Sequence, residues 1–178
     1  MVTNNKGIDL IKHYESLHDG DLKKAGLQPK LDPVGIWTEG WGRAMIDPLT
    51  KKFLRGANNK NRAYELQTIR SILEADAALR LDLASYEAEV YRMMSNGKYF
   101  FNDNQFSALV SMAYNAGGAA VMKTIPRVFN KTPEEVMKAF CMYNKGRVNG
   151  QLVELRGLTF RRKTEATLFS TGELKFFN

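Results

Sequence analysis

The chain has 178 residues, of which 44% are hydrophobic and 25% charged, ordinary values for one soluble globular domain. No run of about 18 uncharged apolar residues occurs, which excludes a transmembrane helix, and the N-terminus lacks the apolar stretch of a secretory signal. The net charge of +7 favours polyanionic partners such as nucleic acid, acidic lipid or a bacterial wall polymer.

The sequence lacks the motifs that typically bind metals or nucleic acids. Cys141 is the only cysteine, which excludes an intramolecular disulfide and a cysteine-based metal site. With His13 and His18 as the only histidines, no structural zinc site is expected. Basic residues cluster loosely between residues 51 and 62, but no zinc-finger, basic-zipper or RNA-recognition motif is present. We therefore expect no metal and no nucleic-acid partner.

The first sixty residues predict a helix and a small sheet. An asparagine cap and apolar residues at helical spacing predict a helix from residue 4 or 5 to Leu17, with Glu15 near its C-terminal end. Residues 18–30 contain glycine and proline and predict a loop. Alternation broken by glycines over residues 31–45 predicts a small twisted sheet or hairpin, and residues 46–61 predict a basic loop.

The rest of the chain predicts helices. Residues 62–94 form an amphipathic stretch interpreted as two helices, and Asn102 with Gln105 resembles a capping box for a helix that stops at Gly117. Residues 132–135 predict another helix start, and a last helix spans about 157–170. The predicted class is α+β, a single domain over residues 1–178. A helix and sheet fill about 1–60, a helical lobe fills about 61–178, and a ligand cleft lies between them.

Two carboxyl groups in the first part of the chain have unlike surroundings. Glu15 has apolar neighbours at a helix C-terminus, where both desolvation and the helix dipole favour the protonated form that a general acid needs. Asp32 precedes a proline in a loop, where a carboxylate is solvated and ionised. Such a pair is what glycosidic cleavage requires. The alternative is a surface glutamate and a turn-forming aspartate.

Three blocks of sequence resemble the phage-type lysozymes of glycoside hydrolase family 24. The first joins residues 10–17 with residues 35–42, which include the Thr-x-Gly-x-Gly run that begins at Thr38. The second, residues 103–117, is similar to the family's Gln-x-x-Ala-Leu-Val-Ser-x-x-Phe/Tyr-Asn-x-Gly helix. The third, residues 157–165, is similar to its Gly-Leu-x-x-Arg-Arg-x-x-Glu. Together the ordered blocks span most of the chain.

The resemblance implies a lysozyme-like fold and a set of catalytic residues. Glu15 would be the general acid, Asp32 the second carboxylate and Thr38 the residue that orients a water. Glu15 and Asp32 are separated by about twice the family's usual interval, so the assignment of Asp32 depends on its interval to Thr38, which matches. Asp19 and Asp21, in the lengthened loop, remain alternatives to Asp32.

The resemblance also assigns residues that bind substrate or orient the acid. Tyr114 and Asn115 would line the saccharide groove, although core packing competes for Tyr114. Arg161 would pair with the catalytic Glu, and its helical spacing with apolar residues independently places it on an inward face, where a cation needs an acidic partner. The alternative for Arg161 is a surface pair with Glu165. Arg43 stands where the family has a histidine and must take over its structural role.

The resemblance implies an endolysin-like muramidase that hydrolyses the β-1,4 bond between N-acetylmuramic acid and N-acetylglucosamine in bacterial peptidoglycan, without cofactor or metal. The protein would accumulate as a monomer in the host cytoplasm, without membrane insertion, and depend on a holin-like membrane protein for release to the wall. Two alternatives stay open. One is a lytic transglycosylase on a related fold, which needs no water-directing Asp–Thr pair. The other is a non-catalytic descendant that binds the wall or nucleic acid.

Overall fold

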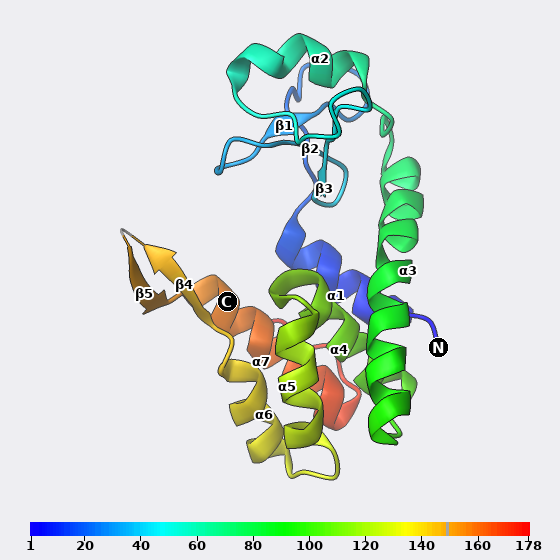
Figure 1. Ribbon diagram of the computed structural model, residues 1–178, viewed down its shortest axis with the longest axis vertical. Coiled ribbons are helices and arrows are strands. Elements are labelled where there is room, and N and C mark those ends of the chain that lie inside the picture. The colour runs from blue at the N-terminus through cyan, green and yellow to red at the C-terminus, as the bar shows by residue number, and fades with distance from the viewer. Residues whose placement is uncertain (149) are drawn as a thin grey trace. The chain divides into compact units, whose positions relative to one another are not determined.

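A computed structural model of the protein describes residues 1–148 and 150–178 (Figure 1). The chain forms two compact units: unit 1 comprises residues 1–14 and 83–178, and unit 2 comprises residues 15–82. This boundary lies within helix α3 (Ile72–Gly97) rather than near residue 60, because Ala75 and Ala78 at the start of α3 pack with Leu27 and Ile69 of unit 2. None of the helices in the described ranges is both long and apolar enough to span a membrane.

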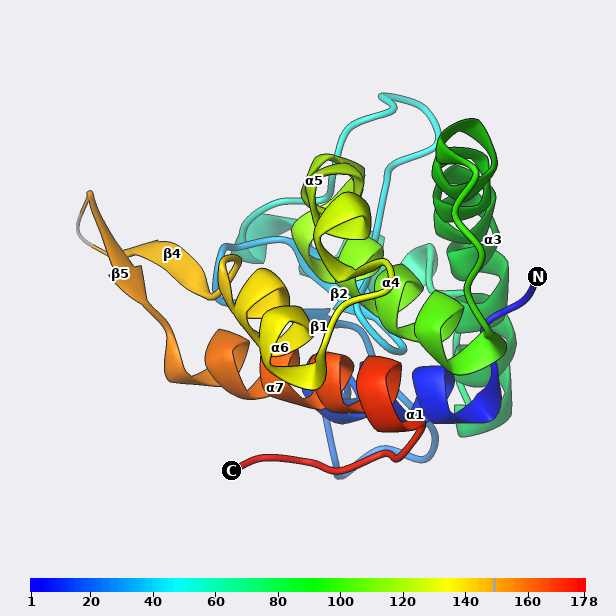
Figure 2. The same cartoon turned by 90° about the horizontal axis from the view of Figure 1, so that it is seen from below.

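Unit 1 is built around a buried helix. Every residue of α4 (Asp103–Ala116) from Phe106 to Ala113 is buried, and α4 packs against α5 (Gly118–Val128) and α7 (Arg156–Thr171). Helix α6 (Pro133–Cys141) packs against α5 and α7, as Figures 1 and 2 show. The buried centre of α4 therefore forms the core of this unit.

The predicted helix caps are confirmed. Asn102 and Gln105 form a reciprocal capping box, with both side chain-to-backbone hydrogen bonds at 3.0 Å. Thr132 and Glu135 form a second one at the start of α6, and α7 ends at Gly172 in the left-handed conformation. Helix α1 (Asn5–Glu15) ends two residues before Leu17, because the next residue has φ 60 and leaves the helical conformation.

Residues 145–154 contradict the expectation of a wholly helical second half. β4 (Lys145–Val148) and β5 (Gln151–Glu154) form an antiparallel hairpin that extends from the helices of unit 1 (Figure 2). Nearly all of its residues are exposed. Since neither face of the hairpin packs on a core, the sequence carries no apolar alternation that would have predicted the strands.

Unit 2 contains the predicted small sheet. β1 (Lys30–Leu31), β2 (Trp37–Glu39) and β3 (Arg43–Ala44) are antiparallel in the order β1-β2-β3. The basic loop ends in a short 3₁₀ helix, η1 (Ala57–Asn59), and α2 (Lys60–Glu65) with α3 confirms the two helices expected from residue 62 onward. The apolar residues form two small clusters instead of one continuous core.

Polar side chains hold the sheet of unit 2 to the segment between α2 and α3 and to α3 itself. The buried carboxylate of Glu39 accepts hydrogen bonds from the Thr68 amide at 2.9 Å, the Thr68 hydroxyl at 2.6 Å and the Ile69 amide at 3.0 Å. The guanidinium of Arg43 donates two hydrogen bonds to the carboxylate of Asp82, at 2.8 and 2.9 Å. Arg43 thus ties the strand that follows the glycine run to α3.

Candidate active site

Glu15 is the last residue of α1 and is half-buried. The chain turns directly after it, and three residues later the His18 amide donates a hydrogen bond to the Gly40 carbonyl at 2.8 Å. Gly40 follows the last residue of β2, so the segment that carries Glu15 is joined to the end of the strand that carries Thr38. Glu15 therefore lies at a helix C-terminus, as its spacing predicts, and the segment that follows it is hydrogen-bonded to the residue after β2.

Asp32 and Thr38 are held by one backbone carbonyl. The Ile36 carbonyl accepts hydrogen bonds from the Asp32 amide at 2.9 Å and from the Thr38 hydroxyl at 3.2 Å. The turn between them is closed by a hydrogen bond from the Gly35 amide to the Asp32 carbonyl at 3.0 Å, with Gly35 at φ 80. The left-handed φ explains the glycine at this position, because other residues adopt it only with strain.

The side chain of Asp32 is fixed through one oxygen. Its Oδ1 accepts hydrogen bonds from the Val34 amide at 2.9 Å and the Ile36 amide at 2.8 Å. Across residues 1–148 and 150–178, no protein group donates a hydrogen bond to its Oδ2. Thr38 is 4% exposed and its hydroxyl proton is directed to Ile36, which leaves the lone pairs of its oxygen as acceptors. Each residue thus retains acceptor capacity for a water.

Asp19 and Asp21, the alternatives to Asp32, form contacts within the lengthened loop. Asp19 Oδ1 accepts hydrogen bonds from the amides of Asp21 and Gln28, both at 3.2 Å. Asp21 accepts from the Lys23 amide at 3.2 Å, and its other oxygen lies 3.8 Å from the Lys24 ammonium. Both aspartates therefore stabilise the conformation of this loop.

Arg161 lies in unit 1 and points inward, as its spacing predicts. It is 2% exposed and its Nε lies 3.3 Å from Oε1 of Glu165, which is fully buried. Its guanidinium also lies over the ring of Tyr14, 5.9 Å from the ring centre. The alternative for Arg161 was a surface ion pair with Glu165 at the i, i+4 spacing. The ion pair is present, but both of its side chains are buried.

Arg162 is a buried residue of this cluster that the sequence reasoning missed. Its Nη2 donates hydrogen bonds to Oε1 of Glu165 at 2.9 Å and to Oδ1 of Asn115 at 3.0 Å. Burial lowers the pKa of the Arg162 guanidinium, and the charge of Glu165 opposes that shift. The signal was present in the motif, because Glu165 stands three residues after Arg162 as well as four after Arg161.

The two predicted saccharide-binding residues lie in the last turn of α4. Tyr114 is half-buried and its ring meets that of Tyr86 edge to face, with centroids 5.3 Å apart. Asn115 is exposed, and Arg162 holds its carbonyl oxygen, which leaves its NH₂ group available as a donor. Glu15, Asp32 and Thr38 thus belong to unit 2, where the Ile36 carbonyl joins Asp32 and Thr38. Tyr114, Asn115 and Arg161 belong to unit 1.

The part of the chain that the structure describes contains no group of three or more His, Cys, Asp or Glu side chains with the geometry of a metal site. The side chains of Glu15, Asp32 and Thr38 can transfer protons between carboxyl groups and a water.

The chain is similar to proteins of a known family. The family model described as phage lysozyme matches residues 23–165, a range that begins after Glu15 and contains the other five predicted site residues. The curated endolysin of Bacillus phage B103 is 29% identical over 177 residues. The match covers 98% of this chain but 56% of that relative, so the chain spans about half of its length.

Solved structures confirm the lysozyme-like α+β fold. The endolysin from Escherichia coli O157:H7 phage FAHEc1 superposes with a TM-score of 0.74 at 26% identity, over 98% of this chain and 97% of that one. The muramidase domain of SpmX from Asticaccaulis excentricus gives a TM-score of 0.67 at 27% identity, over 95% and 97%. The active form of the P1 phage endolysin Lyz, at 22% identity and a TM-score of 0.59 over 96% and 85%, shares the fold.

Proposed function

Because the chain belongs to the phage lysozyme family, we propose that it is a peptidoglycan hydrolase, and specifically a muramidase. Its reaction is hydrolysis of the β-1,4 bond between N-acetylmuramic acid and N-acetylglucosamine. The observation that carries the proposal is the shared anchoring of Asp32 and Thr38 on the Ile36 carbonyl, in the same unit as Glu15. This is the set of one acid, one second carboxylate and one water-orienting hydroxyl that the reaction needs.

In the proposed reaction, Glu15 donates its proton to the glycosidic oxygen as the bond from that oxygen to the anomeric carbon breaks. Asp32 faces the positive charge that develops on the sugar ring. A water that hydrogen-bonds to Asp32 Oδ2 and to the Thr38 oxygen supplies the new oxygen at the anomeric carbon, and its proton passes to a carboxylate. No metal or organic cofactor takes part in these steps.

The residues of unit 1 receive supporting roles. We assign Arg161 to the orientation of Glu15, as a positioning residue. Its guanidinium lies over the ring of Tyr14, the residue directly before Glu15, which supports that role. Asn115 would donate its amide protons to the saccharide, and Tyr114 would supply an apolar wall. Arg162 supports this assignment because its hydrogen bond holds the Asn115 carbonyl oxygen toward the protein, which turns the NH₂ group away from Arg162.

The endolysin names of the relatives support a role in phage-driven lysis of a bacterial host. In that role the protein would act as a monomer and remain in the host cytoplasm until a holin-like membrane protein permits its release to the wall. The net charge of +7 suits an anionic wall polymer.

Mass spectrometry of muropeptides released from purified peptidoglycan tests the bond and the reaction together. The proposal predicts products that end in a reducing N-acetylmuramic acid. Products lighter by one water, with a 1,6-anhydro ring, would instead identify a lytic transglycosylase. Products that end in reducing N-acetylglucosamine would show that the enzyme cleaves the bond after N-acetylglucosamine instead. Binding of peptidoglycan without any products would identify a non-catalytic wall protein.

The choice of Asp32 as second carboxylate has its own test. Asp32→Asn is expected to lower the rate of peptidoglycan clearing by about 10²-fold or more. Asp19→Asn and Asp21→Asn are matched controls, since each removes one loop carboxylate, and both are expected to stay within a few-fold of the wild-type rate. An active Asp32→Asn protein beside an inactive Asp19 or Asp21 variant would overturn the assignment.

A further inference from the structure

The loop between β3 and α2 contains a tightly held turn, residues 46–55, which we call the 46–55 turn. Ile46 and Phe53 pair as an isolated bridge, and the Lys51 amide donates to the Asp47 carbonyl at 2.8 Å. Asp47 Oδ1 also accepts from the amides of Leu49 at 2.8 Å and Thr50 at 3.2 Å. The turn is therefore held in one conformation by its own backbone and by a single carboxylate.

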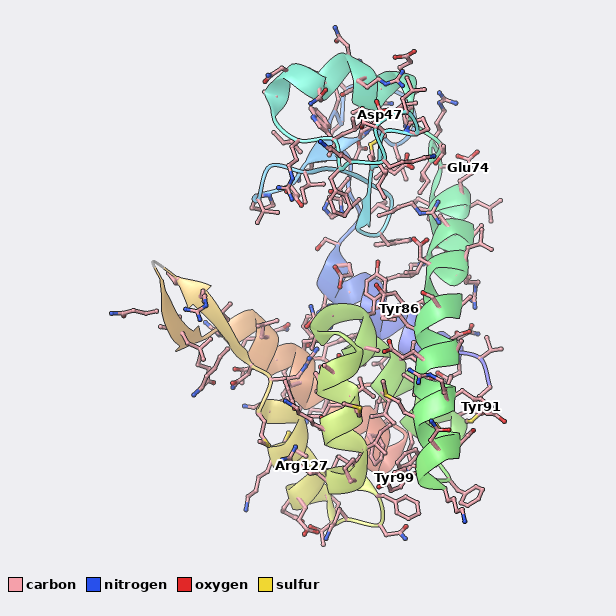
Figure 3. All side chains as sticks on the ribbon, viewed as in Figure 1. Asp47, Glu74, Tyr86, Tyr91, Tyr99 and Arg127 are labelled. Carbon is pink, nitrogen blue, oxygen red and sulfur yellow. The ribbon has the colours of Figure 1, made fainter. Side chains whose placement is uncertain are left out.

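Arg62 anchors this carboxylate from outside the turn. Its Nε donates to Asp47 Oδ2 at 2.9 Å, and this hydrogen bond lowers the pKa of Asp47. Figure 3 labels Asp47 among the loops beside α2, the helix that carries Arg62. Because Asp47 is the only acid of the 46–55 turn and is paired with Arg62, it does not neutralise the cations of the turn.

The outer surface of the turn is both apolar and cationic. Leu49 is 83% exposed, Ile46 52% and Phe53 48%. Three exposed cations stand among them: Lys51, Lys52 and Arg55. A hollow of about 390 Å³ is lined by all of these residues except Leu49, and the Arg55 guanidinium lies over the Phe53 ring at 5.9 Å. None of the three cations forms an ion pair within residues 1–148 and 150–178.

We propose that the 46–55 turn docks the protein on an anionic phospholipid bilayer, with the cations at the headgroup phosphates and Leu49, Ile46 and Phe53 at the acyl boundary. A hydrated wall polymer would use the cations but would leave the apolar side chains in water. An anionic bilayer is complementary to both features, since interfacial segments combine apolar insertion with attraction of Lys and Arg to acidic lipid. The inference is independent of the hydrolase chemistry proposed above, because it uses none of the catalytic residues.

Vesicle sedimentation tests the proposal directly. The full chain is mixed with vesicles of phosphatidylglycerol and phosphatidylcholine, or of phosphatidylcholine alone, at low and at physiological salt. We expect binding to the anionic vesicles alone, weakened by salt. The double variant K51Q/K52Q is expected to lower the partition coefficient by ~30-fold, from the contribution of two basic residues near an anionic surface. Leu49→Asn is expected to lower it several-fold.

Matched controls separate the turn from the overall charge. K123Q/K138Q removes two exposed lysines from α5 and α6, and Leu73→Asn changes a leucine that is 81% exposed on α3. Both controls are expected to bind vesicles as the wild type does, and all variants are expected to keep wild-type melting temperatures and peptidoglycan clearing. The proposal is overturned if the wild type ignores anionic vesicles, if the controls lose as much binding as the turn variants, or if Lys51 and Lys52 mediate binding to purified walls but not to vesicles.

Discussion

The two units of the molecule are stabilised in different ways. Unit 1 is built around the buried centre of α4, and its buried charged side chains are those of Arg161, Arg162 and Glu165. Unit 2 has two small apolar clusters, and its sheet and loops are held by individual carboxylates that accept backbone amides, among them Glu39, Asp32 and Asp47. A core tolerates little change in volume or charge, whereas a single lost hydrogen bond in unit 2 acts locally.

The largest effect on stability is expected in unit 1. Glu165→Gln leaves two buried guanidinium groups without the carboxylate that lies 2.8 Å from Arg162 Nε and 3.3 Å from Arg161 Nε. Breaking a buried ion pair in this way costs about 3–5 kcal/mol of the free energy of unfolding, which urea denaturation measures. Glu135→Gln, at an exposed helix cap, is the control. A loss of less than about 1 kcal/mol for Glu165→Gln would show that the cluster behaves as a surface pair.

The counterpart in unit 2 is Glu39→Ala. It leaves the Thr68 and Ile69 amides without their buried acceptor, so we expect a loss of about 2 kcal/mol. Hydrogen exchange should accelerate at these two amides while the amides of α4 keep their protection. Glu65→Ala, which removes a mostly exposed partner of Arg62, is expected to change neither. Equal acceleration of exchange in α4 would mean that the two units unfold together, which would contradict their different modes of stabilisation.

A smaller effect is expected at the start of α6. Thr132→Ala removes the side chain that accepts a hydrogen bond from the Glu135 amide at 3.3 Å, which should cost about 1 kcal/mol in the free energy of unfolding. Thr50→Ala, at an exposed position of the 46–55 turn, serves as control. If the two substitutions had the same effect in thermal denaturation, the capping box would contribute nothing to stability.

The smallest effect concerns Asp47, and it depends on pH. The hydrogen bond from Arg62 lowers the pKa of the folded carboxyl below its unfolded value of 3.8. Asp47 therefore stabilises the fold at pH values above about 4, and this contribution is lost as pH falls through the folded pKa. Asp47→Asn should be slightly less stable than the wild type at neutral pH, and urea denaturation should show the difference shrinking below pH 4. A constant difference across that range would exclude the charge as its source.

The sequence predicted those elements whose local chemistry agrees with their tertiary environment. Capping residues such as Asn102 and Thr132 predicted the starts of α4 and α6, and glycine-broken alternation predicted the sheet. No bounds were predicted for α5, because Pro126, inside it, interrupts the signals of a continuous helix. The β4–β5 hairpin was missed because its residues are exposed on both faces and show no alternation of apolar and polar side chains.

The candidate site shows a similar limit. Glu15, Asp32 and Thr38 could be proposed from the motif blocks, but the carbonyl that Asp32 and Thr38 share depends on a turn closed by Gly35, a contact that spacing alone does not define. Arg43 could be identified as a replacement, but its partner Asp82 lies 39 residues away in the sequence. Contacts of this kind arise from tertiary folding, and no local pattern encodes them.

In the proposed mechanism Glu15 supplies the proton for cleavage, and the clearing rate of purified peptidoglycan by Glu15→Gln tests this role most directly. The substitution keeps the size and shape of the side chain but removes the acidic proton. We predict a rate at least about 10²-fold below wild type, with a melting temperature near that of the wild type. A folded Glu15→Gln protein that clears peptidoglycan at the wild-type rate would contradict the account.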